Sequence, residues 1–109
     1  MKVRANGTEL HLQQHGSGPD LVLLHGIAMS SAVWVHQIPL LSGTHRVTAI
    51  DFRGHGRSAK PVMDYSASLL ADDVDAALQQ LGISSATVLG WSMGATVACT
   101  LAARHAARV

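Results

Sequence analysis

VLGWSMGAT, residues 88–96, is the stretch that decides how this chain folds. It places Ser92 between Gly90 and Gly94, after a short apolar run and before a run of small residues. A serine on a tight strand-to-helix turn needs small residues two positions before and after it, so that strand and helix approach without Cβ clashes. The pattern therefore predicts a nucleophile elbow, with the hydroxyl of Ser92 exposed at the C-terminal edge of a sheet, where ligands bind in open α/β folds.

The segments before the elbow indicate a mostly parallel sheet. Apolar runs too short for helices occur at 21–24 and 46–50 and are typical of buried strands, and 87–89 is predicted to be the next strand. Residues 3–12 surround an Asn-Gly dipeptide, which is typical of two-residue hairpin turns. We therefore expect a β-hairpin at the start of the chain and three strands after it, the first two of them buried.

Helical periodicity separates these strands. Apolar residues recur at helical spacing over 66–81, and Gly82 is expected to end that helix. Its carboxylates are predicted to form a solvated face: Asp72, Asp73 and Asp75. A shorter helix is predicted over 32–38, before Pro39, and a helix over 93–108 is apolar nearly all round and is therefore predicted to be buried. A hairpin followed by βαβαβα predicts an α/β fold with right-handed crossovers.

Composition argues against several classes of partner. A chain of 109 residues forms one domain at most, and its formal net charge of +1 carries no basic excess for nucleic acid. No apolar region of a secretory signal follows Lys2 and Arg4, and the most apolar segment, 95–103, is too short for a membrane anchor. We expect a cytoplasmic protein that binds neither nucleic acid nor a membrane.

Metal and redox chemistry are not expected either. The 7 histidines are scattered, with no pair held on a helix at ligand spacing. Cys99 has no partner for a disulfide, and its apolar neighbours predict that it packs inside a helix. The sequence therefore predicts no metal and no cofactor.

Two backbone amides are candidates for an oxyanion hole. A helix that begins at Met93 directs its N-terminus at the elbow, so the Met93 amide and the helix dipole can stabilise negative charge. A second donor must come from another loop. After the strand at 21–24, Gly26 lets the backbone come close, and the Ile27 amide can serve.

Four stretches in this order closely resemble the N-terminal half of the α/β-hydrolase superfamily: LVLLHGIAMSSAVW, RVTAIDFRGHGRSAKP, YSASLLADDVDAALQQLGI and VLGWSMGATVA. The resemblance runs from about Leu10 to Val109 and is greatest to small esterases, lactonases and cofactor-free haloperoxidase-like members. It implies that Ser92 is the nucleophile and that the Ile27 and Met93 amides form the oxyanion hole. It further implies supporting roles in the elbow for Gly90, Gly94, His25 and Gly26, and a pocket wall that includes Trp91, Arg53 and His55.

Two departures from the family pattern concern single positions near the nucleophile. Serine at position 92 argues against the dehalogenase and epoxide-hydrolase branches, which use a carboxylate nucleophile. Ala95 stands where many members carry another glycine, and alanine is small enough that no functional loss is expected.

The triad acid and histidine are absent from the expected part of the chain. In the superfamily they follow the nucleophile, but only His105 and no acidic residue follow Ser92. His105 lies about 20 Å further along the helix by helix rise, and the earlier His25 and His55 resemble loop-supporting residues. We therefore expect residues 1–109 to be a partial α/β-hydrolase domain, truncated before the strand that would pair with 87–89. Its unpaired sheet edge would then favour self-association.

The predicted function is serine hydrolysis of a small ester, lactone or thioester through an acyl-enzyme on Ser92, with a small acyl compound as substrate. The 109 residues alone are expected to be inactive. Two alternatives stay open: an inactive fragment or non-catalytic ligand-binding or interaction module, and an acyltransferase or perhydrolase that uses the same serine. An anion cradle within residues 53–58 is not predicted, because this loop matches neither the P-loop nor the dinucleotide pattern.

Overall fold

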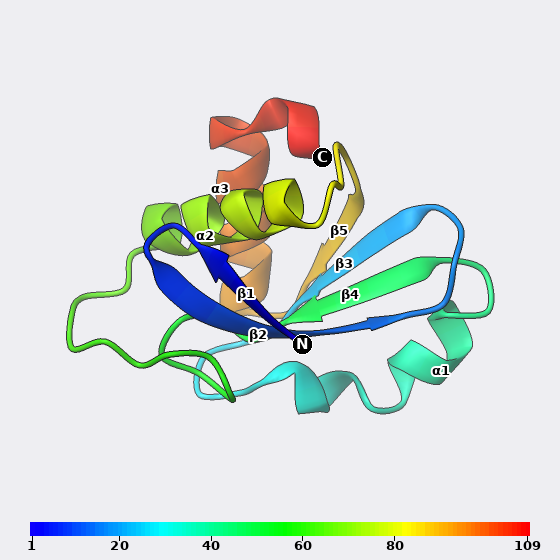
Figure 1. Ribbon diagram of the computed structural model, residues 1–109, viewed down its shortest axis with the longest axis horizontal. Helices are drawn as coiled ribbons and strands as arrows, with labels where there is room; N and C mark the ends of the chain where they lie inside the picture. Colours follow the sequence, from blue (N-terminus) through cyan, green and yellow to red (C-terminus); the bar gives the residue numbers. More distant parts are fainter.

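The structure, a computed structural model of residues 1–109, contains one five-stranded sheet with helices on both faces (Figure 1). Its strands are β1 Lys2–Ala5, β2 Thr8–His15, β3 Asp20–Leu24, β4 Arg46–Ile50 and β5 Thr87–Gly90, in the order β1-β2-β4-β3-β5. Strand β3 runs parallel to β4 and β5, whereas β2 is antiparallel to both β1 and β4. The predicted α/β class, the hairpin, the strand at 87–89 and the buried strands at 21–24 and 46–50 are confirmed, and β5 itself contains no buried residue.

The hairpin turn owes its shape to two residues with positive φ. Asn6 has φ of 51° and Gly7 has φ of 75°, as a two-residue type I′ turn requires. The turn pairs Ala5 with Thr8 and fixes the register of β1 on β2. Strand β2 continues past the end of β1 and pairs with β4, so the hairpin is joined to the central sheet.

The register of the parallel strands brings three turns together. Leu24 at the end of β3 pairs with Ile50 at the end of β4 and with Gly90 at the end of β5. The turns that begin at residues 25, 51 and 91 therefore leave the same edge of the sheet side by side. This edge is where the sequence predicts the site.

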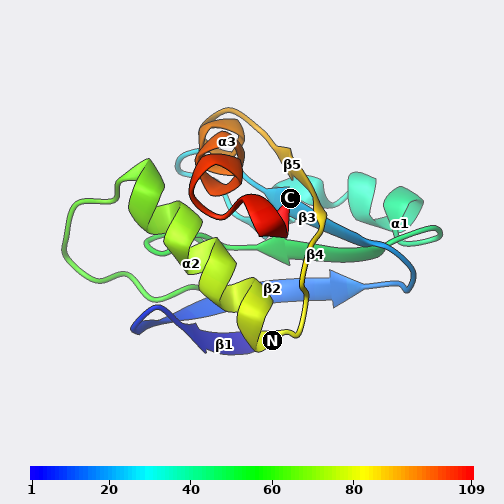
Figure 2. The ribbon, with the colours of Figure 1, turned by 90° about the horizontal axis from the view of Figure 1, so that it is seen from above.

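Helices cover the two faces of the sheet unequally, as Figure 2 shows from above. Helices α2 Ala67–Gln80 and α3 Met93–Arg104 lie on one face, and the short 3-10 helix η1 Ser31–Trp34 with α1 Gln37–Leu41 lies on the other. The larger core cluster of 16 buried residues is under α2 and α3, and a cluster of 6 is under η1 and α1. A 3-10 turn, η2 Ala106–Arg108, follows α3.

Helix boundaries follow local chemistry. The Ser66 hydroxyl accepts a hydrogen bond of 3.1 Å from the Leu69 amide and caps α2, and Gly82 has the positive φ of 71° that ends a helix. The predicted helix over 32–38 is wrong, because this segment forms η1 and the start of α1. Pro39 lies in the first turn of α1, where its missing N–H has no partner to lose. The prediction for 66–81 is confirmed within one residue at each end.

The prediction that 93–108 is a buried helix is wrong in two respects. Helix α3 ends at Arg104, and within it only Gly94, Val97 and Leu101 are buried. Cys99 is exposed, so its predicted packing role is also wrong. The physical reason is that α3 contacts α2 and the sheet along one side, while alanines on its other side have no element against them.

The predicted solvated face of α2 is wrong for Asp73. This carboxylate is 1% exposed and receives the Arg53 guanidinium at 2.8 Å and 2.9 Å. Asp72 and Asp75 are partly exposed; Asp72 pairs with Arg104 at the end of α3, and Asp75 pairs with Arg108 of η2. None of the helices has the length and apolar character needed to cross a membrane.

Candidate active site

The turn between β5 and α3 holds Ser92 in an uncommon backbone conformation. Ser92 has φ of 56° and ψ of −115°, outside the regions that L residues ordinarily occupy. Such a conformation costs on the order of 1–3 kcal/mol and persists only where the surroundings impose it. The residue is exposed, and its hydroxyl caps no helix amide. The turn therefore presents this hydroxyl to solvent at the edge of the sheet.

Two glycines make this conformation possible by close backbone contact. A Cβ on Gly90 would collide with the backbone of Gly94 and Ala95, so the strand and the helix touch directly. A Cβ on Gly94 would lie 2.7 Å from the His25 carbonyl oxygen and closer still to the carbonyl of Leu24. The spacing of these glycines is thus explained by contact on both sides of the turn.

The elbow is also attached to the end of β3. The Trp91 amide donates to the Leu24 carbonyl at 3.0 Å. Gly26 lies against the Trp91 carbonyl, which would be 3.3 Å from an added Cβ. The backbone of 25–27 therefore runs beside the elbow, as the predicted oxyanion hole requires.

The two amides predicted to form that hole have no partner that would compete with a ligand. The Ile27 amide donates no hydrogen bond within the chain. Met93 is the first residue of α3, so its amide precedes the internal hydrogen bonds of that helix. The first turn of α3 carries no acidic residue that would neutralise its N-terminus. Both amides are therefore suited to bind an oxygen atom with negative charge.

His25 is fully buried and links the turns after β3 and β4. Its Nδ1 lies 2.7 Å from the Gly26 carbonyl oxygen, and its Nε2 accepts from the Phe52 amide at 3.0 Å. Acceptance at Nε2 requires the neutral tautomer with its proton on Nδ1. Burial lowers the pKa of His25, and the nearby His55 imidazole acts in the same direction, although the hydrogen bond to Gly26 opposes them. With both nitrogens engaged, His25 is not available to take a proton from Ser92.

The predicted wall residues lie in different surroundings. Trp91 is 49% exposed beside Ser92, and its ring lies 6.2 Å from the ring of Trp34. The His55 ring lies 5.2 Å from that of His25, and its Nδ1 contacts the Arg53 carbonyl. The Arg53 guanidinium is held by Asp73, away from the elbow. The structure therefore groups Trp91 and His55 near the end of β3 and directs the Arg53 side chain toward α2.

Apolar side chains lie next to the elbow on its exposed side. Ile27 is 68% exposed, and Met29 is also exposed, with its sulfur 3.1 Å from the position of a Cβ on Gly26. Trp34 is buried, and its Nε1 is the one buried side-chain polar atom without a hydrogen-bond partner. Together with Trp91 these side chains provide an apolar surface that a small acyl group can contact.

The sequence analysis missed Asp73 as the partner that fixes Arg53. A signal was available, because Asp73 lies three residues after Leu70 and four before Ala77, on the apolar stripe of α2. A carboxylate on such a stripe is buried, and a buried charge needs a partner of opposite sign. The pattern does not identify that partner.

Comparison with known proteins adds a family match. A family model described as alpha/beta hydrolase fold matches residues 19–109. A pimeloyl-acyl-carrier-protein methyl ester esterase of Aeromonas hydrophila subsp. hydrophila is 40% identical over 99 residues, which cover 90% of this chain and 37% of that protein. A haloalkane dehalogenase of Agrobacterium fabrum is 36% identical, covering 98% of this chain and 35% of that protein.

A solved structure gives the same result in three dimensions. The enol-lactonase from Burkholderia xenovorans LB400 superposes with a TM-score of 0.96 at 36% identity, covering 100% of this chain and 44% of that one. The chain therefore spans well under half the length of the relatives it matches. The resemblance stated from the sequence is confirmed.

Proposed function

Because the chain belongs to the alpha/beta hydrolase fold family, we propose that it is the nucleophile-bearing part of a carboxylic ester hydrolase, with Ser92 as the nucleophile. The observation that carries this proposal is the positive φ of Ser92, maintained by contacts of Gly90 and Gly94 with neighbouring backbone. A strained, exposed serine serves no packing purpose, since its side chain is bonded to nothing in the helix it precedes.

The reaction proceeds in two steps on this serine. The Ser92 oxygen attacks the carbonyl carbon of an ester, and the amides of Ile27 and Met93 donate to the oxygen that becomes negative. The tetrahedral intermediate expels the alcohol, which takes up the proton that the Ser92 hydroxyl gave up on attack, and leaves the acyl group on Ser92. Water then attacks the acyl-enzyme, releases the acid and restores the hydroxyl.

The substrate we propose is a small ester, lactone or thioester with an apolar acyl part. Support comes from the apolar side chains of Ile27, Met29 and Trp91 beside the serine, and from the esterase and lactonase among the similar proteins. The similar proteins also include a dehalogenase. A serine at position 92, in place of a carboxylate nucleophile, favours the ester chemistry.

We further propose that the 109 residues do not catalyse the reaction alone. His25 uses both ring nitrogens in structural hydrogen bonds, and His105 is paired with Asp72 and Asp75 at the far end of α3. No side chain is hydrogen-bonded to Ser92. Without a base, the chain retains only binding and oxyanion stabilisation, which by themselves give a small part of the rate.

The test is the hydrolysis of short-chain aryl esters by the native protein, at the length its source produces. Ser92→Ala is expected to lower kcat/KM by at least about 10⁴-fold, while Ser68→Ala, an exposed serine on α2, leaves it unchanged. The 109-residue chain is expected to show no turnover. Full activity in Ser92→Ala would overturn the assignment, and turnover by the 109 residues would overturn their predicted inactivity.

A further inference from the structure

A cavity lies away from the elbow, between β2 and the turns that follow β3 and β4. Its volume is about 520 Å³, and 3 of its 12 lining residues are hydrophobic. Polar side chains reach it from three separate segments: His11 and Gln13 of β2, Ser31 of η1, and Asp51 and Arg57 of the turn after β4. Neither Ser92 nor the amides beside it line this cavity.

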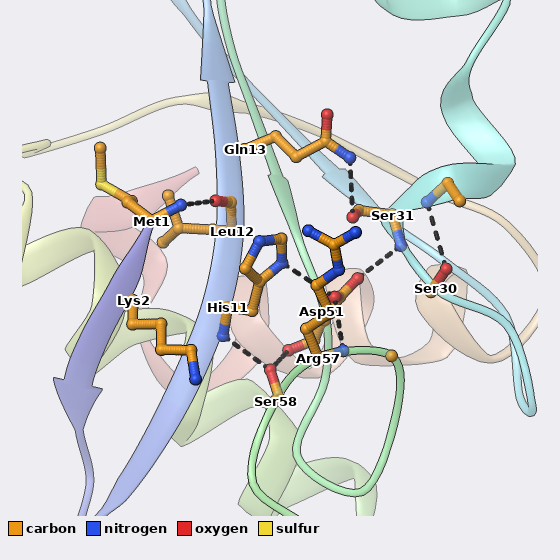
Figure 3. A network of polar contacts seen from close by, with 12 residues as sticks. Met1, Lys2, His11, Leu12, Gln13, Ser30, Ser31, Asp51, Arg57 and Ser58 are labelled. Atoms are coloured by element: carbon orange, nitrogen blue, oxygen red, sulfur yellow. Dashed lines mark hydrogen bonds and ion pairs between the residues drawn. The ribbon is translucent and has the colours of Figure 1, made fainter.

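Asp51 holds the three segments in place (Figure 3). One carboxylate oxygen accepts from the Ser31 amide at 2.5 Å, and the other accepts from the Arg57 amide and from His11 Nδ1, each at 3.0 Å. Burial alone raises the pKa of Asp51, but the hydrogen bonds from the Arg57 and Ser31 amides outweigh it and lower that pKa below its ordinary value. The carboxylate is therefore ionised at neutral pH, and both of its oxygens are occupied by donors of the chain.

Donors that a ligand could use remain on the cavity side of this network. Arg57 is exposed, and its guanidinium makes no hydrogen bond or ion pair, since only its backbone amide reaches Asp51. The Ser31 hydroxyl accepts from Gln13 at 3.0 Å, and its proton, which helps to keep Asp51 ionised, can rotate toward a ligand. In Figure 3 the Arg57 guanidinium points into the space between His11 and Ser31, and all three residues line the same cavity.

The charges around the cavity are predominantly positive. Arg57 and the α-amino group of Met1 are cationic, against the single carboxylate of Asp51. The α-amino group donates to the Leu12 carbonyl at 2.7 Å and is fixed there. An oxyanion would supply the guanidinium with acceptors and negative charge together, whereas a neutral ligand would supply acceptors alone.

We propose that this cavity binds a small oxyanion, a carboxylate or a phosphoryl group, through hydrogen bonds from the Arg57 guanidinium and the Ser31 hydroxyl. Arginine favours both groups because its parallel N–H bonds match two oxygens of one anion. His11 lines the cavity from β2, where its Nδ1 is held by the Asp51 carboxylate. A bound anion thereby joins the turn after β3, which carries Ile27, to the turn after β4.

The test is isothermal titration of the native protein with inorganic phosphate and, separately, with acetate at matched ionic strength. We expect saturable binding of at least one anion, weakened about tenfold or more in Arg57→Gln. That variant keeps the backbone amide that holds Asp51, so the network survives. Lys60→Gln is the matched control, because it removes one nearby positive charge whose ammonium contacts only backbone carbonyls.

A second variant distinguishes a site with specific hydrogen bonds from nonspecific attraction of anions by positive charge. Ser31→Ala keeps the amide bonded to Asp51 and is expected to weaken the anion several-fold, although it changes no charge. Binding of phosphate alone would assign a phosphoryl ligand, and binding of acetate a carboxylate. The proposal is overturned if neither anion binds, or if Arg57→Gln and Lys60→Gln weaken binding equally. Either result leaves the role of Ser92 unaffected.

Discussion

Two turns leave the same edge of the sheet and are held by opposite means. The turn at 90–94 is fixed by contact between backbone atoms, with Gly90 and Gly94 leaving no room for a Cβ. The turn at 51–58 is fixed by polar bonds, because the Asp51 side chain accepts from three donors and the Ser58 hydroxyl bonds back to the Asp51 carbonyl. Only the first turn places a non-glycine residue, Ser92, at positive φ.

The comparison shows how a reactive side chain is held in position without hydrogen bonds of its own. A side chain that must attack a substrate cannot be tied by hydrogen bonds of its own, so steric contact has to impose its backbone conformation. Asp51 differs from Ser92, because its side chain holds neighbouring segments through its hydrogen bonds. The two turns are therefore expected to respond differently to an added Cβ and to the removal of a hydrogen-bond acceptor.

The largest effect is expected from crowding the elbow. Gly94→Ala places a Cβ against the carbonyls of Leu24 and His25, and relief requires backbone movement that costs about 3 kcal/mol of unfolding free energy. The matched control is Gly82→Ala, which has positive φ but nothing within 4 Å, so that only about 1 kcal/mol is lost. Urea denaturation measures both. Gly94 has no positive φ, so a loss at 94 no larger than the loss at 82 would mean that the contacts do not require glycine there.

A smaller loss is expected when an acceptor is removed from the polar turn. Asp51→Asn replaces one carboxylate oxygen with a donor that faces another donor, which costs about 2 kcal/mol. Asp64→Asn is the control, because Asp64 is exposed and makes no hydrogen bond. Thermal unfolding of the two variants at neutral pH provides the measurement. If Asp51→Asn is as stable as Asp64→Asn, the turn does not depend on these bonds.

A change of opposite sign is expected at the nucleophile. Ser92→Gly relieves the strain of the positive φ of 56°, whereas the extra entropy of glycine in the unfolded chain acts against this gain. The net result is expected to be a rise of about 1 kcal/mol in the unfolding free energy. Ser68→Gly, in the regular helix α2, should instead lower it by about 0.5–1 kcal/mol. Denaturant midpoints of the two variants decide the sign. A destabilised Ser92→Gly would show that the serine conformation carries no strain.

The smallest effect concerns acidification. His25 has a lowered pKa in the folded chain, so below its ordinary value of 6.5 the unfolded chain binds a proton that the folded chain does not. Stability is therefore predicted to fall as pH drops from 6.5 toward the folded pKa. In His25→Asn, which keeps a short side-chain amide donor for the Gly26 carbonyl, this slope is expected to be reduced. Stability curves that are flat and identical for both proteins would contradict the prediction.

The sheet and α2 could be predicted because their signals are local. The strands 21–24 and 46–50 are short apolar runs, and α2 has both a capping serine and a regular apolar stripe. The elbow could be predicted for the same reason, since its glycines lie two residues on either side of Ser92. These features depend on neighbours in the sequence and hardly on the rest of the chain.

The remaining features depend on contacts between distant segments. Alanines in α3 are compatible with a buried or an exposed surface, and only the position of the helix beside β5 decides between them. The ion pair of Arg53 with Asp73 and the bond of His11 to Asp51 join residues 20 and 40 positions apart. The anion cavity likewise takes Arg57 from one loop and Ser31 from another, so no motif within residues 53–58 could have revealed it.

The central claim, that Ser92 is a nucleophile held ready by its elbow, is tested most directly by reacting the native protein with a fluorophosphonate and locating the adduct by peptide mass spectrometry. We expect one phosphonylated residue, Ser92, and no adduct in Ser92→Ala. A protein that hydrolyses esters while Ser92 stays unmodified, or that carries the adduct on another residue, would contradict it.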